Sequence, residues 1–211
     1  MAIQPHYNRL AGRSLERIAA LSDGVFAVAM TLMVLDLHVP SMAAVQSAAD
    51  LARALLALAP RVLVYLMSFL TLGIFWLGQQ TQLSNLSSSD RDLAWLQFAF
   101  LCAASVLPFT TALIAEFVTF RLALLVYWAN ILLLGAMLLA SWRHARRAGL
   151  VPDDQAIAVA CAIERRILVA QALYAAAAAL CVISTWWSLG LILLVQLNYA
   201  IAPRLPWLRQ L

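Results

Sequence analysis

The chain has 211 residues, of which 64% are hydrophobic and 11% charged, with a mean hydropathy of +0.88. Soluble chains average about 25% charged residues, so this composition excludes a soluble globular domain and fits one bundle of membrane helices. All 14 basic residues are arginines, and the net charge is +4. Because these arginines stand at the ends of apolar segments, they indicate membrane topology and not a nucleic-acid partner.

Residues 17–37 form the first apolar segment, and its length suits a helix that crosses a bilayer. It carries Asp23, and an ionisable group at this depth usually faces a bundle interior, a partner or water. Val28, Leu32 and Leu35 follow at i, i+4 and i+7, on one helical face. This face allows two interpretations: ordinary helix packing, or stacked apolar rings that line a narrow pore where identical helices meet.

The rest of the chain predicts one interfacial helix and five further spans. Residues 41–59 are amphipathic and include Asp50 and Arg53, which favours an extracellular interfacial helix over a span. The expected spans are 60–80, 93–117, 121–142, 165–184 and 186–202. Pro108 must kink the second of these or end its regular part. We therefore expect an all-α integral membrane protein with six transmembrane helices, in a single domain over residues 1–211.

The arginines also predict the orientation of the chain. With six spans both termini lie on one side, and 11 of the 14 arginines fall on that side. The three on the other side are Arg53, Arg61 and Arg121. Since basic residues accumulate in cytoplasmic loops, both termini are expected to be cytoplasmic. Arginine without lysine, together with abundant alanine, indicates a bacterial source, and hence the bacterial plasma membrane.

No motif in the sequence indicates catalysis. The chain lacks a His-Glu-x-x-His pair, a glycine-rich phosphate loop and a Gly-x-Ser-x-Gly elbow, and its three histidines are far apart. The three cysteines form no Cys-x-x-Cys pair, so neither a zinc site nor a redox motif is expected. We predict no enzyme, no cofactor and no metal site. Polar residues inside the membrane concentrate in the first three spans, where the functional core is expected.

Asp23 allows a functional and a structural interpretation. Its carboxylate could lie in an ion path and attract cations, or it could join Arg17 and Ser22 in a network that pins the first helix to the next two. The second interpretation is favoured, because buried carboxylates normally need partners. The hydroxyl of Thr31 can bond back to the carbonyl of Ala27, as helical threonines often do.

The first helix resembles a family signature. Arg17-x-x-x-Leu21-Ser22-Asp23 is similar to the Arg-x-x-x-Phe-Ser-Asp motif that opens the first helix of the transmembrane protein 175 potassium channels. Phe75-Trp76 and Pro108-Phe109-x-Thr111 also look like that family, so the resemblance covers roughly the first half of the chain. Leu21 replaces phenylalanine and keeps the apolar role.

The resemblance implies a homotetramer in which the first helix of each chain lines a central pore. Val28, Leu32 and Leu35 would then form the hydrophobic gate, and Thr31 would contribute to selectivity. Arg17, Ser22 and Asp23 would form a network that supports the pore. Two further positions depart from the family pattern. Gln79 stands where the family usually has histidine, which removes a group that titrates near neutral pH, and Gln97 stands near a frequent asparagine.

These observations predict a potassium-permeable cation channel of weak to moderate selectivity, since the chain lacks the Thr-Val-Gly-Tyr-Gly carbonyl filter. Its partners would be identical chains, the lipid bilayer and potassium ions, with no nucleic acid. The alternative is a proton- or ion-coupled secondary transporter that uses Asp23, with Pro108 marking a broken helix. A third hypothesis is a non-conducting assembly or anchoring protein.

Overall fold

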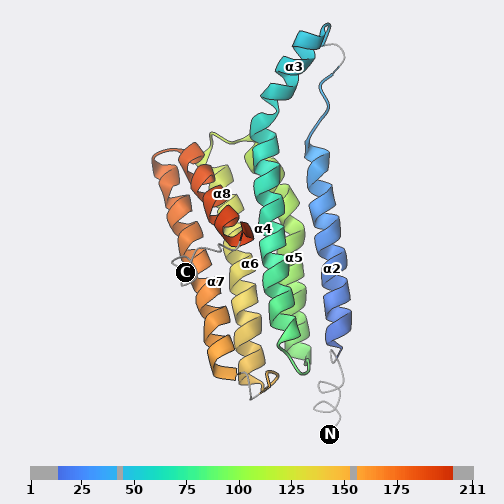
Figure 1. The fold of residues 1–211 in the computed structure, drawn as a ribbon, viewed down its shortest axis with the longest axis vertical. Coiled ribbons are helices and arrows are strands. Elements are labelled where there is room, and N and C mark those ends of the chain that lie inside the picture. The colour runs from blue at the N-terminus through green and yellow to red at the C-terminus, as the bar shows by residue number, and fades with distance from the viewer. Residues whose placement is uncertain (1–13, 42–44, 153–155, 202–211) are drawn as a thin grey trace.

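The computed structural model describes residues 14–41, 45–152 and 156–201, and Figure 1 shows a bundle of long helices that share one axis. No strand occurs within these ranges, in agreement with the expected all-α fold. The elements are α2 (Leu15–Leu32), η1 (Met33–Asp36), α3 (Ala48–Ala57), α4 (Ala59–Ser84), α5 (Arg91–Glu116), α6 (Arg121–Arg147), α7 (Ala156–Ala179), η4 (Leu180–Val182) and α8 (Thr185–Ile201).

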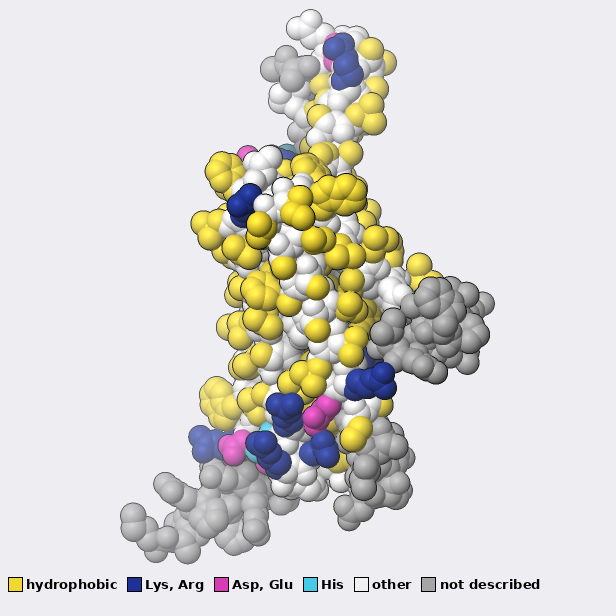
Figure 2. Space-filling model, turned by 90° about the vertical axis from the view of Figure 1, so that its left-hand side faces the viewer, with side chains coloured by type: hydrophobic (Ala, Val, Ile, Leu, Met, Phe, Trp, Pro, Cys, Tyr) yellow, Lys and Arg dark blue, Asp and Glu magenta, His cyan; other side chains and the backbone are white. Residues whose placement is uncertain are grey.

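The helices have the length and composition of membrane spans. Within the described ranges, five segments can cross a bilayer: α2 with η1, then α4, α5, α6, and the part of α7 and η4 from Cys161 to Val182. The sixth expected span, α8, is apolar but shorter, with 17 residues against the roughly 20 that a span needs. Figure 2 shows hydrophobic side chains over the middle of the molecule and charged ones mostly at one end. The six-helix membrane bundle is therefore confirmed, with a short last helix.

α2 and α7 lie at opposite edges of the bundle (Figure 1), with α4, α5 and α6 between them. α2 packs mainly on α4 and α5, while α8 packs on α7 and α4. α3 directly precedes α4 in the chain and projects from the end of the bundle where α4 begins (Figure 1). It is shorter than the interfacial helix expected over 41–59, and its place relative to a membrane stays a prediction.

The core is formed mainly where α5 packs on α6. Phe100, Leu107, Leu124 and Tyr127 are fully buried there. Membrane helices gain little from the hydrophobic effect and associate through close packing and hydrogen bonds between helices. Small side chains permit that close packing, and the Asn130 amide donates to the carbonyl of buried Ala103 at 3.1 Å. The α5–α6 pair therefore provides the frame on which the other helices pack.

The second span is longer than expected. The sequence prediction ended it at residue 80, within a run of four polar residues (79–82), but α4 continues to Ser84. Gln79 and Gln82 face the interior and are hydrogen-bonded there; Gln82 donates to the carbonyl of Leu138 at 3.1 Å. Polar residues therefore extend this helix because they have partners in the neighbouring helices.

The loop expected over residues 143–164 is also largely helical. α6 runs to Arg147 and α7 begins at Ala156, where the predictions were 142 and 165. Glu164 on α7 pairs with Arg146 at 2.6 Å and with Arg143 at 3.7 Å on α6. Charged residues mark where the hydrophobic segment stops, but the helix itself continues beyond it into water. There the charged side chains of α6 and α7 pair with one another. Likewise, α5 passes through Pro108 without ending.

The loops at this end of the bundle are bonded to one another. Asp90 caps α5 by accepting the amide of Leu93 at 2.7 Å, and its carboxylate also contacts the ring of His144 at 2.9 Å. The amide of Ser87 donates to the carbonyl of Leu150 at 2.9 Å. These bonds hold the α4–α5 connection against the end of α6.

Candidate functional site

α2 begins at a side-chain cap and buries one of its faces. The Ser14 hydroxyl accepts the amide of Arg17 at 3.3 Å, which pairs one of the free donors of the first turn. Further along, Phe26 and Ala29 on α2 and Met33 at the start of η1 recur at helical spacing and are buried against α4 and α5. The Phe26 ring lies 5.9 Å from that of Phe100 on α5. This face fixes α2 against the bundle.

A second face, which runs along α2 and into η1, is largely exposed in the part of the chain that the structure describes. Val28, Leu32 and Leu35 are 57%, 47% and 68% exposed, and Leu21 extends the same row by two turns. The row follows the spacing noted in the sequence, and the packed face of α2 points elsewhere. Among the described residues these side chains are therefore largely uncovered, which argues against the first interpretation, packing within one chain.

Asp23 is bonded to α4. Its Oδ1 accepts from the indole nitrogen of Trp76 at 2.7 Å and from the amide of Gln80 at 2.9 Å. Two donors from one neighbouring helix hold the carboxylate in place, as a charged group within an apolar helix requires. Asp23 thus links α2 to α4.

Ser22 begins a buried chain of hydrogen bonds across three helices. Its hydroxyl donates to Oε1 of Gln79 on α4, and Nε2 of Gln79 donates to Oε1 of Gln97 on α5 at 2.7 Å. Ser22 and Gln79 are 0% exposed and Gln97 is 2% exposed. The three side chains therefore connect α2, α4 and α5 away from solvent.

Arg17 and Thr31 lie apart from these contacts. Arg17 is exposed and forms no ion pair with the described residues, so the structure does not join it to Asp23 within one chain. The Thr31 hydroxyl bonds back to the carbonyls of Ala27 at 3.0 Å and Val28 at 2.9 Å, which confirms the expected bond to Ala27. The functional roles assigned to these two residues stay predictions.

Sequence reasoning missed two partners of the site. Trp76 and Gln80 were not assigned to Asp23, although they lie four residues apart and so share one face of α4. Gln79 lies next to this face and takes the bond from Ser22. The spacing of Trp76, Gln79 and Gln80 could have indicated these contacts, because polar side chains within an apolar span must find hydrogen-bond partners on neighbouring helices.

The site combines an exposed apolar row with hydrogen-bonded polar groups behind it. Among the described residues no group of three or more His, Cys, Asp or Glu side chains could hold a metal ion. The exposed row of α2 offers methyl groups only, and such a surface repels water when several copies surround a narrow space. The polar groups lie behind it and connect α2 to α4 and α5.

Three comparisons place the chain among known proteins. The family model described as endosomal/lysosomal potassium channel TMEM175 matches residues 17–108. A protein of Chamaesiphon minutus named potassium channel Cha6605_3372 is 32% identical over 88% of this chain and 93% of its own length. The human protein named endosomal/lysosomal proton channel TMEM175 is 34% identical over 45% of this chain and 20% of its own length.

The fold comparison agrees with the sequence comparison. The crystal structure described as a lysosomal potassium-selective channel TMEM175 homolog from Chamaesiphon minutus has a TM-score of 0.78 and 30% identity to this chain, covering 90% of this chain and 98% of that one. Similarity over 90% of the chain extends beyond residue 108, where the family model ends. The chain therefore belongs to the TMEM175 family.

Proposed function

We propose that this protein is a potassium-permeable cation channel, assembled as a homotetramer whose four copies of α2 surround the pore. The observation that carries the proposal is the exposed apolar row of Val28 and Leu32 on α2 and Leu35 on η1, while another face of α2 is fixed by packing and by hydrogen bonds. One such helix cannot enclose an ion path. Several copies arranged around an axis would convert the row into stacked apolar rings.

The rings would act as the gate. An ion that passes an apolar constriction loses water without gaining other ligands, so a narrow ring blocks it and a wider or wetted ring conducts. Val28 would form the narrowest ring, and Asp23, Ser22 and their partners would hold α2 in position behind it. Arg17 would belong to the same supporting network.

Potassium is the proposed permeant ion because the bacterial relatives in Chamaesiphon minutus and Streptomyces collinus are named potassium channels; the second is 33% identical over 66% of this chain. The animal relatives are named proton channels, so proton flux is the competing activity. In this chain Gln79 provides an amide in the network behind the gate, and an amide does not titrate near neutral pH.

Selectivity would be weak to moderate. The sequence has no carbonyl filter, so discrimination between ions would come from side chains and pore width. Thr31 lies beside the gate row, and its hydroxyl oxygen keeps lone pairs after donating to the helix. A partly dehydrated potassium ion could use these lone pairs as ligands.

The protein would lie in a bacterial plasma membrane with both termini in the cytoplasm. Arg143, Arg146 and Arg147 cluster at the end of the bundle where α2 begins, and Figure 2 shows charged side chains gathered at that end. A basic end marks the cytoplasmic side. All the relatives named above are channels, which agrees with the expectation that this chain is not an enzyme.

The test is single-channel recording of purified protein in planar bilayers under a potassium/sodium gradient. Val28→Ala should raise conductance by widening the ring, and Val28→Asn should raise it by wetting the ring. The control is Val106→Ala, which changes an exposed valine on α5, outside the proposed pore row.

Unchanged currents in both Val28 variants, from protein shown to be folded and tetrameric, would remove α2 from the pore. Saturable flux far below channel rates would instead favour a transporter that uses Asp23. A complete absence of ion flux would favour an assembly protein.

A further inference from the structure

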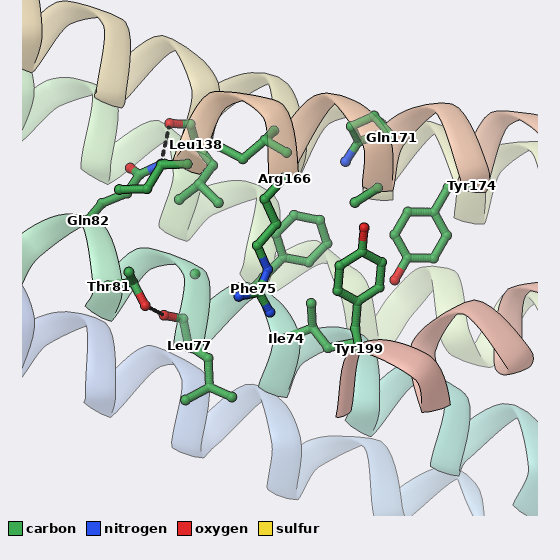
Figure 3. Close-up of a pocket in the computed structure, with 14 residues that line it drawn as sticks. Ile74, Phe75, Leu77, Thr81, Gln82, Leu138, Arg166, Gln171, Tyr174 and Tyr199 are labelled. Atoms are coloured by element: carbon green, nitrogen blue, oxygen red, sulfur yellow. Dashed lines mark hydrogen bonds between the residues drawn. The ribbon is translucent and has the colours of Figure 1, made fainter. Parts of the chain in front are cut away.

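A cavity lies on the side of the bundle away from α2, between α4, α6, α7 and α8 (Figure 3). Its volume is about 100 Å³, and it opens to the outside of the bundle. Ile74, Leu77 and Ile163 are among the apolar residues that line it. Its polar lining is confined to a few side chains, among them Gln82, Arg166, Gln171 and Tyr174.

Arg166 is the charged group of this cavity. It belongs to a segment of α7 that is long and apolar enough to cross a membrane, and Figure 3 shows its side chain extending into the cavity. Its guanidinium lies 5.6 Å from the centre of the Tyr199 ring. None of the ion pairs among the described residues includes Arg166, and the nearby Glu164 pairs with Arg143 and Arg146. Arg166 is exposed, so its guanidinium is available to an anionic group.

Buried polar atoms without partners accompany Arg166. Oε1 of Gln82, Oε1 of Gln171 and the hydroxyl of Tyr174 have no hydrogen-bond partner among the described residues. Gln82 is 2% exposed and Tyr174 1%, so bulk water does not solvate them. Buried polar atoms normally have a partner, and three without one in the same cavity indicate a polar ligand.

The wall of the cavity is built around Gln171. Its Nε2 donates to the carbonyl of Ile131 at 3.3 Å, and this leaves Oε1 free for a ligand. The amide lies directly over Gly135, where a side chain of any size would collide with it. Glycine at this position of α6 therefore lets Gln171 occupy its place beside the cavity.

We propose that the cavity binds the headgroup of an anionic phospholipid whose headgroup carries hydroxyl groups, such as phosphatidylglycerol. Figure 3 shows Gln82, Arg166 and Tyr174 in this order along the cavity. A headgroup hydroxyl donates to Oε1 of Gln82, the phosphate accepts from Arg166, and an ester oxygen accepts from the hydroxyl of Tyr174. The acyl chains lie along Ile74 and Leu77 at the opening.

This lipid provides a complementary group for Arg166 and for two of the three unpaired polar atoms, those of Gln82 and Tyr174. Basic cavities between membrane helices at the cytoplasmic side are a recurring form of anionic lipid site. α8 packs on both α7 and α4, so a lipid bound here would join the last helices to a helix that supports α2. The site goes beyond the proposed pore and does not depend on it.

The experiment measures binding of dioleoyl-phosphatidylglycerol and dioleoyl-phosphatidylcholine to the purified full-length protein by native mass spectrometry. Wild type should bind phosphatidylglycerol with a Kd at least about ten-fold lower than that for phosphatidylcholine, and Arg166→Gln should abolish the difference. The matched control is Arg147→Gln, which removes the same charge from the α6 end, outside this cavity.

A second variant keeps the charge and fills the space. Ala170 lines the cavity, so Ala170→Leu should weaken phosphatidylglycerol binding about ten-fold while the protein elutes as the same oligomer. Equal affinity of wild type for the two lipids would overturn the proposal. So would selectivity that survives Arg166→Gln but is lost in Arg147→Gln, since the binding surface would then be the cytoplasmic arginine cluster.

Discussion

Replacing Gln79 by leucine should destabilise the bundle more than replacing Ser22, Gln79 and Gln97 together by apolar residues. Gln79 accepts from Ser22 and donates to Gln97 at 2.7 Å, and all three are at most 2% exposed. The single change leaves the Ser22 hydroxyl and Oε1 of Gln97 without the partners they have in the wild type. The triple change, Ser22→Ala with Gln79→Leu and Gln97→Leu, removes the polar groups themselves.

The magnitude follows from the number of groups left unpaired. Each buried polar group without a partner costs about 1–3 kcal/mol in soluble proteins, which gives about 2–6 kcal/mol for two. Hydrogen bonds between membrane helices average only about 0.6 kcal/mol, because polar groups also find partners in the unfolded state within the membrane. We therefore expect Gln79→Leu to cost about 1–3 kcal/mol and the triple variant to lie within about 1 kcal/mol of wild type.

The measurement is the free energy of unfolding of purified protein in mixed detergent micelles, by titration with a denaturing detergent. The control is Ser105→Ala, because this exposed hydroxyl bonds, among the described residues, to the carbonyl of Cys102 in its own helix, at 2.8 Å. A triple variant at least as unstable as Gln79→Leu would refute the reasoning, since the cost would then come from lost packing and not from unpaired polar groups.

Two further predictions concern α2. Thr31→Val keeps the shape of the side chain and removes its hydroxyl oxygen, so the potassium-to-sodium permeability ratio should fall while the elution volume of the tetramer stays the same; an unchanged ratio would exclude Thr31 from selectivity. Asp23→Ala removes the acceptor of Trp76 and Gln80 and should reduce the yield of tetramer on size-exclusion chromatography, whereas Asp23→Asn keeps an acceptor oxygen and should assemble. Loss of assembly in both variants would show that the charge itself is required.

The sequence by itself determined the class of the protein and the position of α2. An apolar segment of about 20 residues in lipid must bond its backbone internally, so hydropathy alone predicts the membrane helices. The period of the side chains also grouped Val28, Leu32 and Leu35 on one face, and the other described residues leave that face largely exposed. These features are local, since each depends only on residues within one helix.

The helix ends were predicted less well, for a physical reason. Hydropathy predicts where a segment leaves the hydrocarbon core of the bilayer. A helix, however, ends where its backbone groups lose their hydrogen-bond partners. Gln79 and Gln82 lie in α4 because neighbouring helices supply their hydrogen bonds, and Glu164 lies in α7 beside the arginines of α6. A sequence window does not contain those neighbours.

The tertiary structure alone decided which residues meet across the bundle. Asp23 and Trp76 are 53 residues apart in the chain, and their bond depends on how α2 and α4 cross and in which register. The cavity around Arg166 likewise requires side chains from α4, α6, α7 and α8 at one level. Helical periodicity fixes the direction of each side chain on its own helix, but the angle and offset between helices follow from the packing of all of them together.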